Sequence, residues 1–315
     1  MTQKCFKTLD EQIEILRARG LNIEDCAGAK AILERENYYN LINGYKYPFI
    51  NKRVAPESYV AGAKFDEIFA LYSFDRNIRK LFLSGLLIVE NTMKSLIAYK
   101  FSEKYGHDNY LKISNFETSI PGKSQNENIA RLIATAYHTI AGRLNKGQNA
   151  ISHYVDNHGY VPLWVLVNAM TFGAVSVFYS LMKSQDKQEV AKHFMIADSQ
   201  LKAILDALTI FRNICAHDER LYNFMLAKKS IGNSKYHAAL GISMDKGGNY
   251  IVGKRDVFAL MISLKKLLLK KDYDELCDNL NQEFDNLSEK LSAVSLAEIQ
   301  SIMGFPSNWY DLKKM

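Results

Sequence analysis

The longest stretch of helical periodicity in the chain runs from Phe65 to about Lys104. Apolar residues recur there at intervals of three and four, which places them on one face of an α-helix. They are Ile68, Leu71, Phe74, Ile78, Leu81, Phe82, Val89, Met93 and Leu96. The pattern predicts one long helix, or two helices joined near Ser84-Gly85. Its most apolar part contains Glu90 and is followed by Lys94, so it is too short and too polar to span a bilayer.

Shorter segments with the same periodicity predict further helices around this one. They cover residues 8–20, 25–36, 127–144, 162–182, 187–194, a segment that starts at Asp198 as N-cap, 256–271 and 273–291, and a last helix that Ser295 and Glu298 cap and Gly304 ends. Residues 106–122 are expected to form a loop. Residues 240–252 carry the one clear hairpin signal, because two short apolar runs flank a turn sequence. The fold class is therefore mostly α, with one small β-hairpin insertion.

The segment NYYNLINGYKYPFI, residues 37–50, is rich in aromatic and turn-forming residues. We expect it to pack an N-terminal helical region, residues 1–60, onto a helical domain that comprises residues 61–315 with the C-terminal helices. Alternatively, the two parts form one continuous domain. The N-terminal region is then either part of the core or a separate regulatory lobe.

One predicted helix breaks its own apolar pattern in the stretch FRNICAHDERLYN, residues 211–223. On a helical wheel that starts at Leu201, Arg212 falls inside the apolar stripe. Asn213 and His217 lie one turn apart at the border of that stripe. A guanidinium keeps its proton, so burying it without a partner is costly. Arg212 therefore either pairs with a buried carboxylate or faces a cleft or a partner.

Asp75 and Glu90 are the candidate carboxylates, because both lie near the apolar face of the long helix. The other reading is chemical. An arginine can hold a phosphate through two hydrogen bonds and stabilise the charge that develops on it. A histidine can take or give a proton near neutral pH, and an asparagine can orient either group. This set suits cleavage of RNA, in which the 2′-hydroxyl is the nucleophile and no metal is required.

Composition and charge permit this reading without requiring it. The formal net charge is +6 and the sequence pI is about 8.9, which is mildly basic. The four cysteines are far apart and form no CxxC pair, so neither a zinc site nor a disulfide framework is predicted. We expect no metal and no cofactor. The N-terminal residues lack the apolar run of a signal peptide, so we expect a cytoplasmic protein without a membrane partner.

The Arg212–His217 segment resembles the signature of HEPN domains, in which four to six residues separate an arginine from a histidine. An asparagine follows the arginine here, as that family prefers. A second segment, RLIATAYH from Arg131 to His138, fits the spacing but lacks the asparagine. We treat that second segment as a chance match.

A longer set of motifs resembles the Abi-like family of bacterial abortive-infection proteins, the AbiD/AbiF group of phage-defence factors. The motifs are NYYNLINGYKYPF, FDEIFALYSFDRNIRKLFL, PLWVLVNAMTFGAVSVFYSLM, FRNICAHDERLYN and IMGFPSNWYDL, in this order. They extend over roughly Leu9 to Leu312. Family members often carry a second histidine directly after the motif histidine, where this chain has Asp218. This departure affects the proton relay and leaves Arg212 and His217 in place.

The resemblance implies a HEPN-type helical bundle with RNA-cleaving, toxin-like activity that is restrained until phage infection. HEPN ribonucleases usually bring two copies of the motif together across an interface, and this chain has one good copy. The resemblance therefore implies a homodimer with a composite cleft, in which the stripe around Arg212 faces the second copy. The AbiF-like branch is also similar to the HEPN modules of RNA-guided CRISPR ribonucleases. A structured non-coding RNA is therefore expected as a bound partner or regulator.

Under this reading Arg212 holds the scissile phosphate, and His217 acts as general base or acid. Asn213 orients the phosphate or the histidine. Asp75 and Glu90 position Arg212, or form a simple structural pair with it. Each of the three motif residues also has a structural alternative: a buried ion pair, a hydrogen-bonded core histidine and a helix–helix hydrogen bond, respectively.

Several neighbouring residues are candidates for RNA contacts. Arg220, Tyr222 and Asn223 follow the motif and could line the cleft, although capping and dimer packing explain them equally well. Arg79 and Lys80 on the long helix are candidates for phosphate contacts.

Two further groups of residues are expected to have no role in the site. Lys265, Lys266, Lys270 and Lys271 are expected on the exposed side of an amphipathic helix, as a solvated face rather than an RNA track. His153 and His158 have a poor spacing for metal binding and are expected to lie in a loop.

Two other functions remain open at this point. The chain could be a non-catalytic RNA-binding protein that forms a ribonucleoprotein with a structured non-coding RNA and uses the same cleft only to grip phosphate. It could also be a scaffold whose arginine and histidine only close the dimer.

Overall fold

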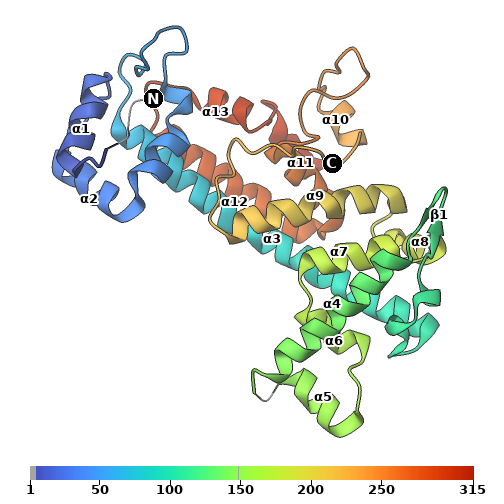
Figure 1. Cartoon of the computed structure of the whole chain (residues 1–315). Coiled ribbons are helices and arrows are strands. Elements are labelled where there is room, and N and C mark those ends of the chain that lie inside the picture. Colours follow the sequence, from blue (N-terminus) through green and yellow to red (C-terminus); the bar gives the residue numbers. More distant parts are fainter. Residues whose placement is uncertain (1–4, 148) are drawn as a thin grey trace.

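The computed structural model of the protein describes residues 5–147 and 149–315, and its axis is one helix of 41 residues, α3 (Phe65–Tyr105). At 1.5 Å per residue this helix is about 60 Å long. Figure 1 shows it running diagonally through the molecule, with the N-terminal helices at one end and the helices of the middle of the chain at the other. The long apolar pattern therefore forms one helix rather than two, and Gly85 lies buried within it.

The N-terminal helices pack against the first half of α3. They are α1 (Leu9–Ala18), which Thr8 caps through a capping box with Glu11, and α2 (Cys26–Glu36), which Asp25 caps. A π-helical turn (Tyr39–Asn43) and a 3₁₀ turn (Tyr47–Phe49) follow. The buried side chains of this region join those of α3 in one hydrophobic cluster. Both helices lie within the ranges predicted from the sequence.

The far end of α3 is covered by shorter helices (Figure 1). They are α4 (Asn126–Leu144), α5 (Ala150–His158), α6 (Leu163–Ala169), α7 (Phe172–Leu181) and α8 (Ser184–Lys192). The single helix expected over 162–182 is interrupted, because Met170 is extended and the Thr171 hydroxyl caps α7 by accepting from Ala174 N at 3.2 Å. His153 and His158 lie on α5 and not in a loop.

The mostly-α fold class with a small hairpin is confirmed, and a further pair of short strands was not expected. The strands β1 (Ser119–Ile120) and β2 (Lys123–Ser124) pair antiparallel at the end of the segment expected to be a loop. The hairpin expected in residues 240–252 is present in a short form: Met244 and Tyr250 make an isolated antiparallel bridge, Asp245 N donates to the Asn249 carbonyl at 2.8 Å, and Ile251 N donates to the Ser243 carbonyl at 3.1 Å. The Asp245 carboxylate supports the turn by accepting from Gly247 N at 2.8 Å and Asn249 N at 2.9 Å.

The remaining helices are α9 (Asp198–Ala216), α10 (Lys235–Ala239), α11 (Val257–Leu267), α12 (Lys270–Ser288) and α13 (Leu296–Ile302), followed by a 3₁₀ turn (Trp309–Lys314). Of these helices, α9, α11 and α12 pack against α3 (Figure 1). α9 begins one residue later than expected, since its cap is Ala197 and Asp198 is its first residue. The capping box of Ser295 and Glu298 is present as predicted.

The expected lysine face is divided between two helices. Lys265 and Lys266 are half-buried at the end of α11, and Lys270 and Lys271 are exposed at the start of α12. The four residues therefore do not share one solvated helix face.

By length and composition alone, α3 could also cross a membrane. Half of its most apolar window is buried against other helices, and the core helix of a soluble protein passes the same test.

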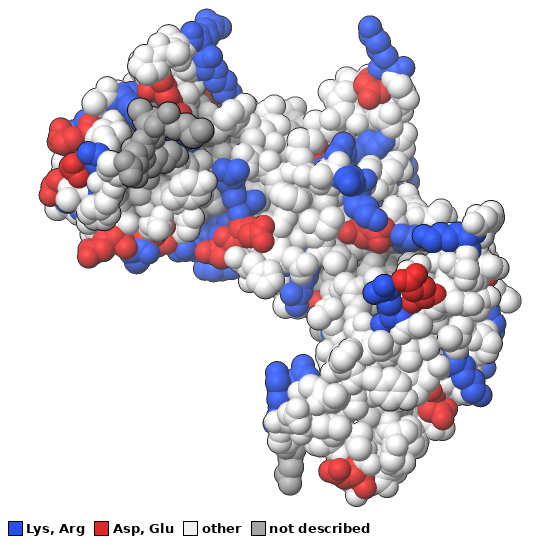
Figure 2. Space-filling view, in the orientation of Figure 1, with Lys and Arg blue, Asp and Glu red and all other residues white. Residues whose placement is uncertain are grey.

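Figure 2 shows that Lys and Arg are interspersed with Asp and Glu on the face drawn, and that uncharged side chains cover most of its concave middle.

Gly304 allows a test of the C-terminal packing. It has φ +81°, and a Cβ there would overlap the carboxylate of Asp256, which caps α11 by accepting from Ala259 N at 3.0 Å. Gly304→Ala should lower the free energy of unfolding by about 1–2 kcal/mol for the left-handed backbone and by about 1 kcal/mol more for the displaced cap, measured by urea denaturation.

Gly62→Ala is the matched control, since Gly62 has the same φ of +81° and nothing within 4 Å of the added Cβ. This substitution should lower the free energy of unfolding only by the contribution of the left-handed backbone, about 1–2 kcal/mol. Equal losses in the two variants would contradict the role assigned to the Asp256 cap.

Candidate functional site

The three motif residues lie together at the C-terminal end of α9. Arg212 is partly buried, with 29% of its side chain exposed, whereas Asn213 and His217 are exposed. His217 ends the helix, and its backbone N–H donates to the Asn213 carbonyl at 2.9 Å. The structure thus presents an amide and an imidazole to solvent beside a half-covered guanidinium.

Arg212 is held from one side only. Its Nε donates to Glu90 Oε2 on α3 at 3.3 Å, so Glu90 is the buried carboxylate that the apolar stripe required. Glu90 also accepts from Lys94 Nζ at 2.8 Å. Among the described residues, none accepts a hydrogen bond from the terminal nitrogens of Arg212. One carboxylate is thus shared by two cations, which leaves an excess positive charge and free N–H donors at this point of the surface.

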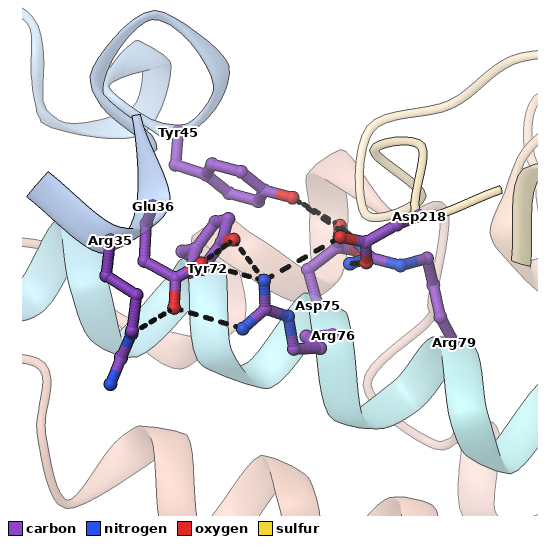
Figure 3. Close-up of polar contacts among 8 residues, drawn as sticks. All are labelled: Arg35, Glu36, Tyr45, Tyr72, Asp75, Arg76, Arg79 and Asp218. Carbon is purple, nitrogen blue, oxygen red and sulfur yellow. Dashed lines mark hydrogen bonds and ion pairs between the residues drawn. The ribbon is translucent and has the colours of Figure 1, made fainter. Parts of the chain in front are cut away.

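Asp75 was the other candidate partner for Arg212, but it lies at the centre of a separate network (Figure 3). It is fully buried and pairs with Arg79 at 2.5 Å. It also accepts from the Tyr45 hydroxyl at 2.7 Å and from the backbone N–H groups of Leu221 at 3.1 Å and Tyr222 at 2.7 Å. Burial raises the pKa of the Asp75 carboxyl, and Arg79 and these donors oppose that rise. The network fixes the path of the chain directly after the motif.

Asp218, the residue directly after the motif histidine, belongs to the same network. Its φ of 57° turns the chain at the end of α9, a conformation that aspartate tolerates better than most residues. Its carboxylate pairs with Arg79 and lies 3.7 Å from Arg76 Nη2 (Figure 3). Asp218 therefore anchors the motif turn to α3.

A second bridge joins α2 to α3 beside this network (Figure 3). Arg76 donates to both carboxylate oxygens of the buried Glu36, at 3.2 and 2.8 Å, and the Tyr72 hydroxyl donates to the same group at 2.6 Å. The hydrogen bonds from Arg76, followed by those from Tyr72 and Arg35, lower the pKa of Glu36 to about 2. Because Arg76 also faces Asp218, the two bridges are continuous.

The two candidates for phosphate contacts on α3 differ in accessibility. Arg79 is 2% exposed, and Asp75 and Asp218 occupy its guanidinium. Lys80 is exposed. Only Lys80 is therefore open to an RNA ligand in this structure.

The three candidates for RNA contacts that follow the motif also differ in burial and in their contacts. Tyr222 is fully buried and stacks on Tyr45 with ring centroids 5.4 Å apart, so it is a packing residue here. Arg220 is exposed and donates to the Gly44 carbonyl at 2.6 Å. Asn223 is half-buried and lines a cavity.

This cavity has a volume of about 660 Å³ and lies between the π-helical turn and the chain after the motif. Asp218, Glu219, Arg220 and the residues from Asn223 to Met225 form one wall, and the turn forms the other through Tyr39, Asn40, Asn43 and Gly44. Sequence reasoning assigned the NYYNLIN segment only to packing. The two exposed asparagines next to exposed Tyr39 were the available signal.

The segment treated as a chance match differs from the motif. Arg131 is 75% exposed on α4 and binds Glu127 through two nitrogens, at 3.0 and 2.7 Å. Its guanidinium is thus on the surface and is paired with a carboxylate of its own helix. Within residues 5–147 and 149–315, no group of three or more His, Cys, Asp or Glu side chains could hold a metal ion.

The Glu36 bridge makes stability pH-dependent. Its folded-state pKa of about 2 lies below the ordinary value of 4.5, so its stabilisation is present above about pH 5 and is lost as the pH falls toward 2. We expect Glu36→Gln to destabilise the protein by about 2–3 kcal/mol at pH 7, and this difference from wild type to shrink by about 1–2 kcal/mol at pH 3, measured by urea denaturation.

Glu34→Gln, an exposed position on the same helix, is the control and should change little at either pH. A difference between wild type and Glu36→Gln that is independent of pH would contradict the ionised bridge.

Comparison with known proteins places the chain in a family. No curated protein and no solved structure matches it significantly. The family model described as Abi-like protein matches residues 31–223, which is more than half of the chain. The match includes Glu36, all of α3 and the motif up to Asn223, and therefore both bridges and the candidate site. The chain thus belongs to the family of Abi-like proteins, which suggests a role in abortive infection as a defence against phage.

Proposed function

We propose that the protein is a metal-independent endoribonuclease of phage defence, with Arg212, Asn213 and His217 as its catalytic residues. One observation carries the proposal: the terminal N–H donors of Arg212 have no protein acceptor among the described residues, although the side chain is 71% covered, and exposed His217 lies at the same helix end. An anchored guanidinium with free donors is suited to a phosphate with two acceptor oxygens.

In the proposed reaction the 2′-hydroxyl of RNA attacks the adjacent phosphorus, and the bond from phosphorus to the 5′ oxygen breaks. A general base takes the proton of the 2′-hydroxyl, and a general acid protonates the leaving 5′ oxygen. The products are a 2′,3′-cyclic phosphate and a 5′-hydroxyl. Arg212 stabilises the charge on the phosphorane oxygens. His217 serves as one of the two proton-transfer groups, and Asn213 orients the phosphate or the imidazole.

A homodimer would supply the second proton-transfer group. The chain has one copy of the motif, and exposed apolar side chains lie beside it. Leu87 and Ile88 on α3 are 41% and 39% exposed, and Leu87 precedes Glu90 by one helical turn. A second copy that covers them would remove apolar surface from water and bring two His217 side chains toward one cleft.

A bound structured RNA would supply the restraint that a defence ribonuclease needs before infection. The same free donors on Arg212 could also grip the phosphates of such an RNA without cleaving it. A non-catalytic ribonucleoprotein is therefore the second candidate function. The two candidates differ in their dependence on His217, since only cleavage needs a proton-transfer group.

Cleavage of single-stranded RNA by purified protein tests the proposal. Arg212→Ala and His217→Ala should each reduce the rate by at least about 100-fold. Products of the wild type should carry 2′,3′-cyclic phosphates, detected by mass spectrometry, and cleavage should persist in EDTA. Arg212→Ala should fold normally, because Glu90 keeps its ion pair with Lys94.

Arg131→Ala and His138→Ala are the matched controls, because they have the same residue types with similar spacing on the exposed face of α4. Both should cleave like wild type. RNA binding without cleavage by the wild type, weakened by Arg212→Ala and unchanged by His217→Ala, would instead establish the ribonucleoprotein. Activity that EDTA abolishes would refute the metal-independent mechanism.

The dimer is tested by Leu87→Glu. A carboxylate in a buried apolar interface is costly, so this variant should be monomeric in light scattering at micromolar concentrations where the wild type is dimeric. Cleavage should fall with the dimer. Val177→Glu, a 46% exposed apolar position on α7, is the control and should stay dimeric. A monomeric, active wild type would rule out the composite site.

A further inference from the structure

The cavity beside the motif turn is a second candidate site. We propose that it binds one unpaired nucleobase of an RNA ligand whose phosphate is held at Arg212. The inference rests on the proposed function only in taking RNA as the ligand. The volume of about 660 Å³ lies within the range of small-molecule sites, about 300–1,000 Å³.

The wall opposite the motif has an unusual backbone. Asn37 has a φ of 61°, and its side chain accepts from Tyr39 N at 2.8 Å, where the π-helical turn begins. π-Helical turns are rare and occur frequently at functional sites. This turn buries Leu41 and Ile42 and leaves Tyr39, 70% exposed, at the cavity. The backbone thus anchors an aromatic ring that is open to solvent.

Polar groups without protein partners converge on the same space. Within the described part of the chain, the side chains of Asn40, Asn43, Asn223 and Glu219 make no hydrogen bond to another residue, and all four line the cavity. Carboxamides can donate and accept at once, as base edges do. A carboxylate accepts from the amino and imino groups of bases. The cavity therefore offers both edge contacts and, through Tyr39, a stacking surface.

The charges of the cavity favour a base over a phosphate. Asp218 and Glu219 supply two carboxylates, and the one cation of its lining, Arg220, also donates to the Gly44 carbonyl. An anion would gain little net attraction there. A flat, uncharged ligand with polar edges avoids this repulsion, whereas the excess positive charge lies at Arg212. The α3 partners of the two sites, Arg79 and Glu90, are about 16 Å apart along the helix, so the sites would take a base and a phosphate from different nucleotides of one strand.

The cavity is also adjacent to the chemistry. Asp218, Glu219 and Arg220 directly follow His217 in the chain, and consecutive Cα atoms are 3.8 Å apart. A base in the cavity would therefore belong to a nearby nucleotide of the same strand, rather than to the nucleotide whose phosphate lies at Arg212. The Asp75 hydrogen bonds to Leu221 and Tyr222 hold this segment in place relative to α3.

A fluorescent base tests this proposal independently of cleavage. The probe is a 2′-O-methyl nonamer of uridines with one central 2-aminopurine, which cannot be cleaved because its nucleophile is blocked. Wild-type protein should quench the 2-aminopurine on binding, because the base stacks on Tyr39. Tyr39→Leu should abolish the quenching and weaken binding about tenfold. The probe annealed to its complement should show no quenching by the wild type.

Tyr137→Leu is the matched control, since Tyr137 is 55% exposed on α4 and outside the cavity. It should quench like wild type. No quenching by the wild type, equal loss in both variants, or equal quenching of the duplex would each overturn the nucleobase site. Quenching by a wild type that does not cleave RNA would retain the nucleobase site and reject the ribonuclease.

Discussion

The buried pair of Asp75 and Arg79 is the interaction on which the candidate site depends. Two ionised groups taken out of water are tolerated only when further hydrogen bonds satisfy them, and here Tyr45 and two backbone N–H groups do so. These donors come from the N-terminal region and from the chain after the motif. A single carboxylate therefore joins three segments that are far apart in the sequence. Removing it would leave the Arg79 charge buried with Asp218 as its one carboxylate partner among the described residues.

Most of the fold could be predicted from the periodicity of apolar residues and from capping signals. Continuous helix across Ser84-Gly85 could not be decided, because a glycine inside a helix is locally ambiguous and only packing against α11 and α12 resolves it. The break at Met170 was missed although Thr171 is a common N-cap residue and Gly173 a poor helix former, because the apolar run of residues 162–182 continues across it. The turn signal at residues 240–252 located a short hairpin correctly, whereas the two-residue strands β1 and β2 are too short to leave an alternating pattern in the sequence.

The site was only partly predictable. The apolar stripe correctly required a carboxylate for Arg212, and Glu90 was one of two candidates. The sequence could not choose between them, because that depends on the register of α9 against α3. Two further contacts could not be predicted: Lys94 shares Glu90, and Arg76 binds Glu36. In the sequence these side chains look like ordinary charges on a helix surface. The π-helical turn has no simple sequence signature, so the cavity it lines was not expected. The ribonuclease activity, the dimer and the RNA partner remain predictions.

The continuity of α3 between Arg79 and Glu90 has a consequence for how this protein can vary. Both residues lie on one uninterrupted helix, and each has its partner on α9 or directly after it. Insertion or deletion of one residue between them would rotate the second contact by about 100° and shift it by about 1.5 Å along the axis. Substitutions on the exposed side of this segment are tolerable, but a change in its length is not. Changes in length should therefore be confined to the loops, such as the connection between β1 and β2.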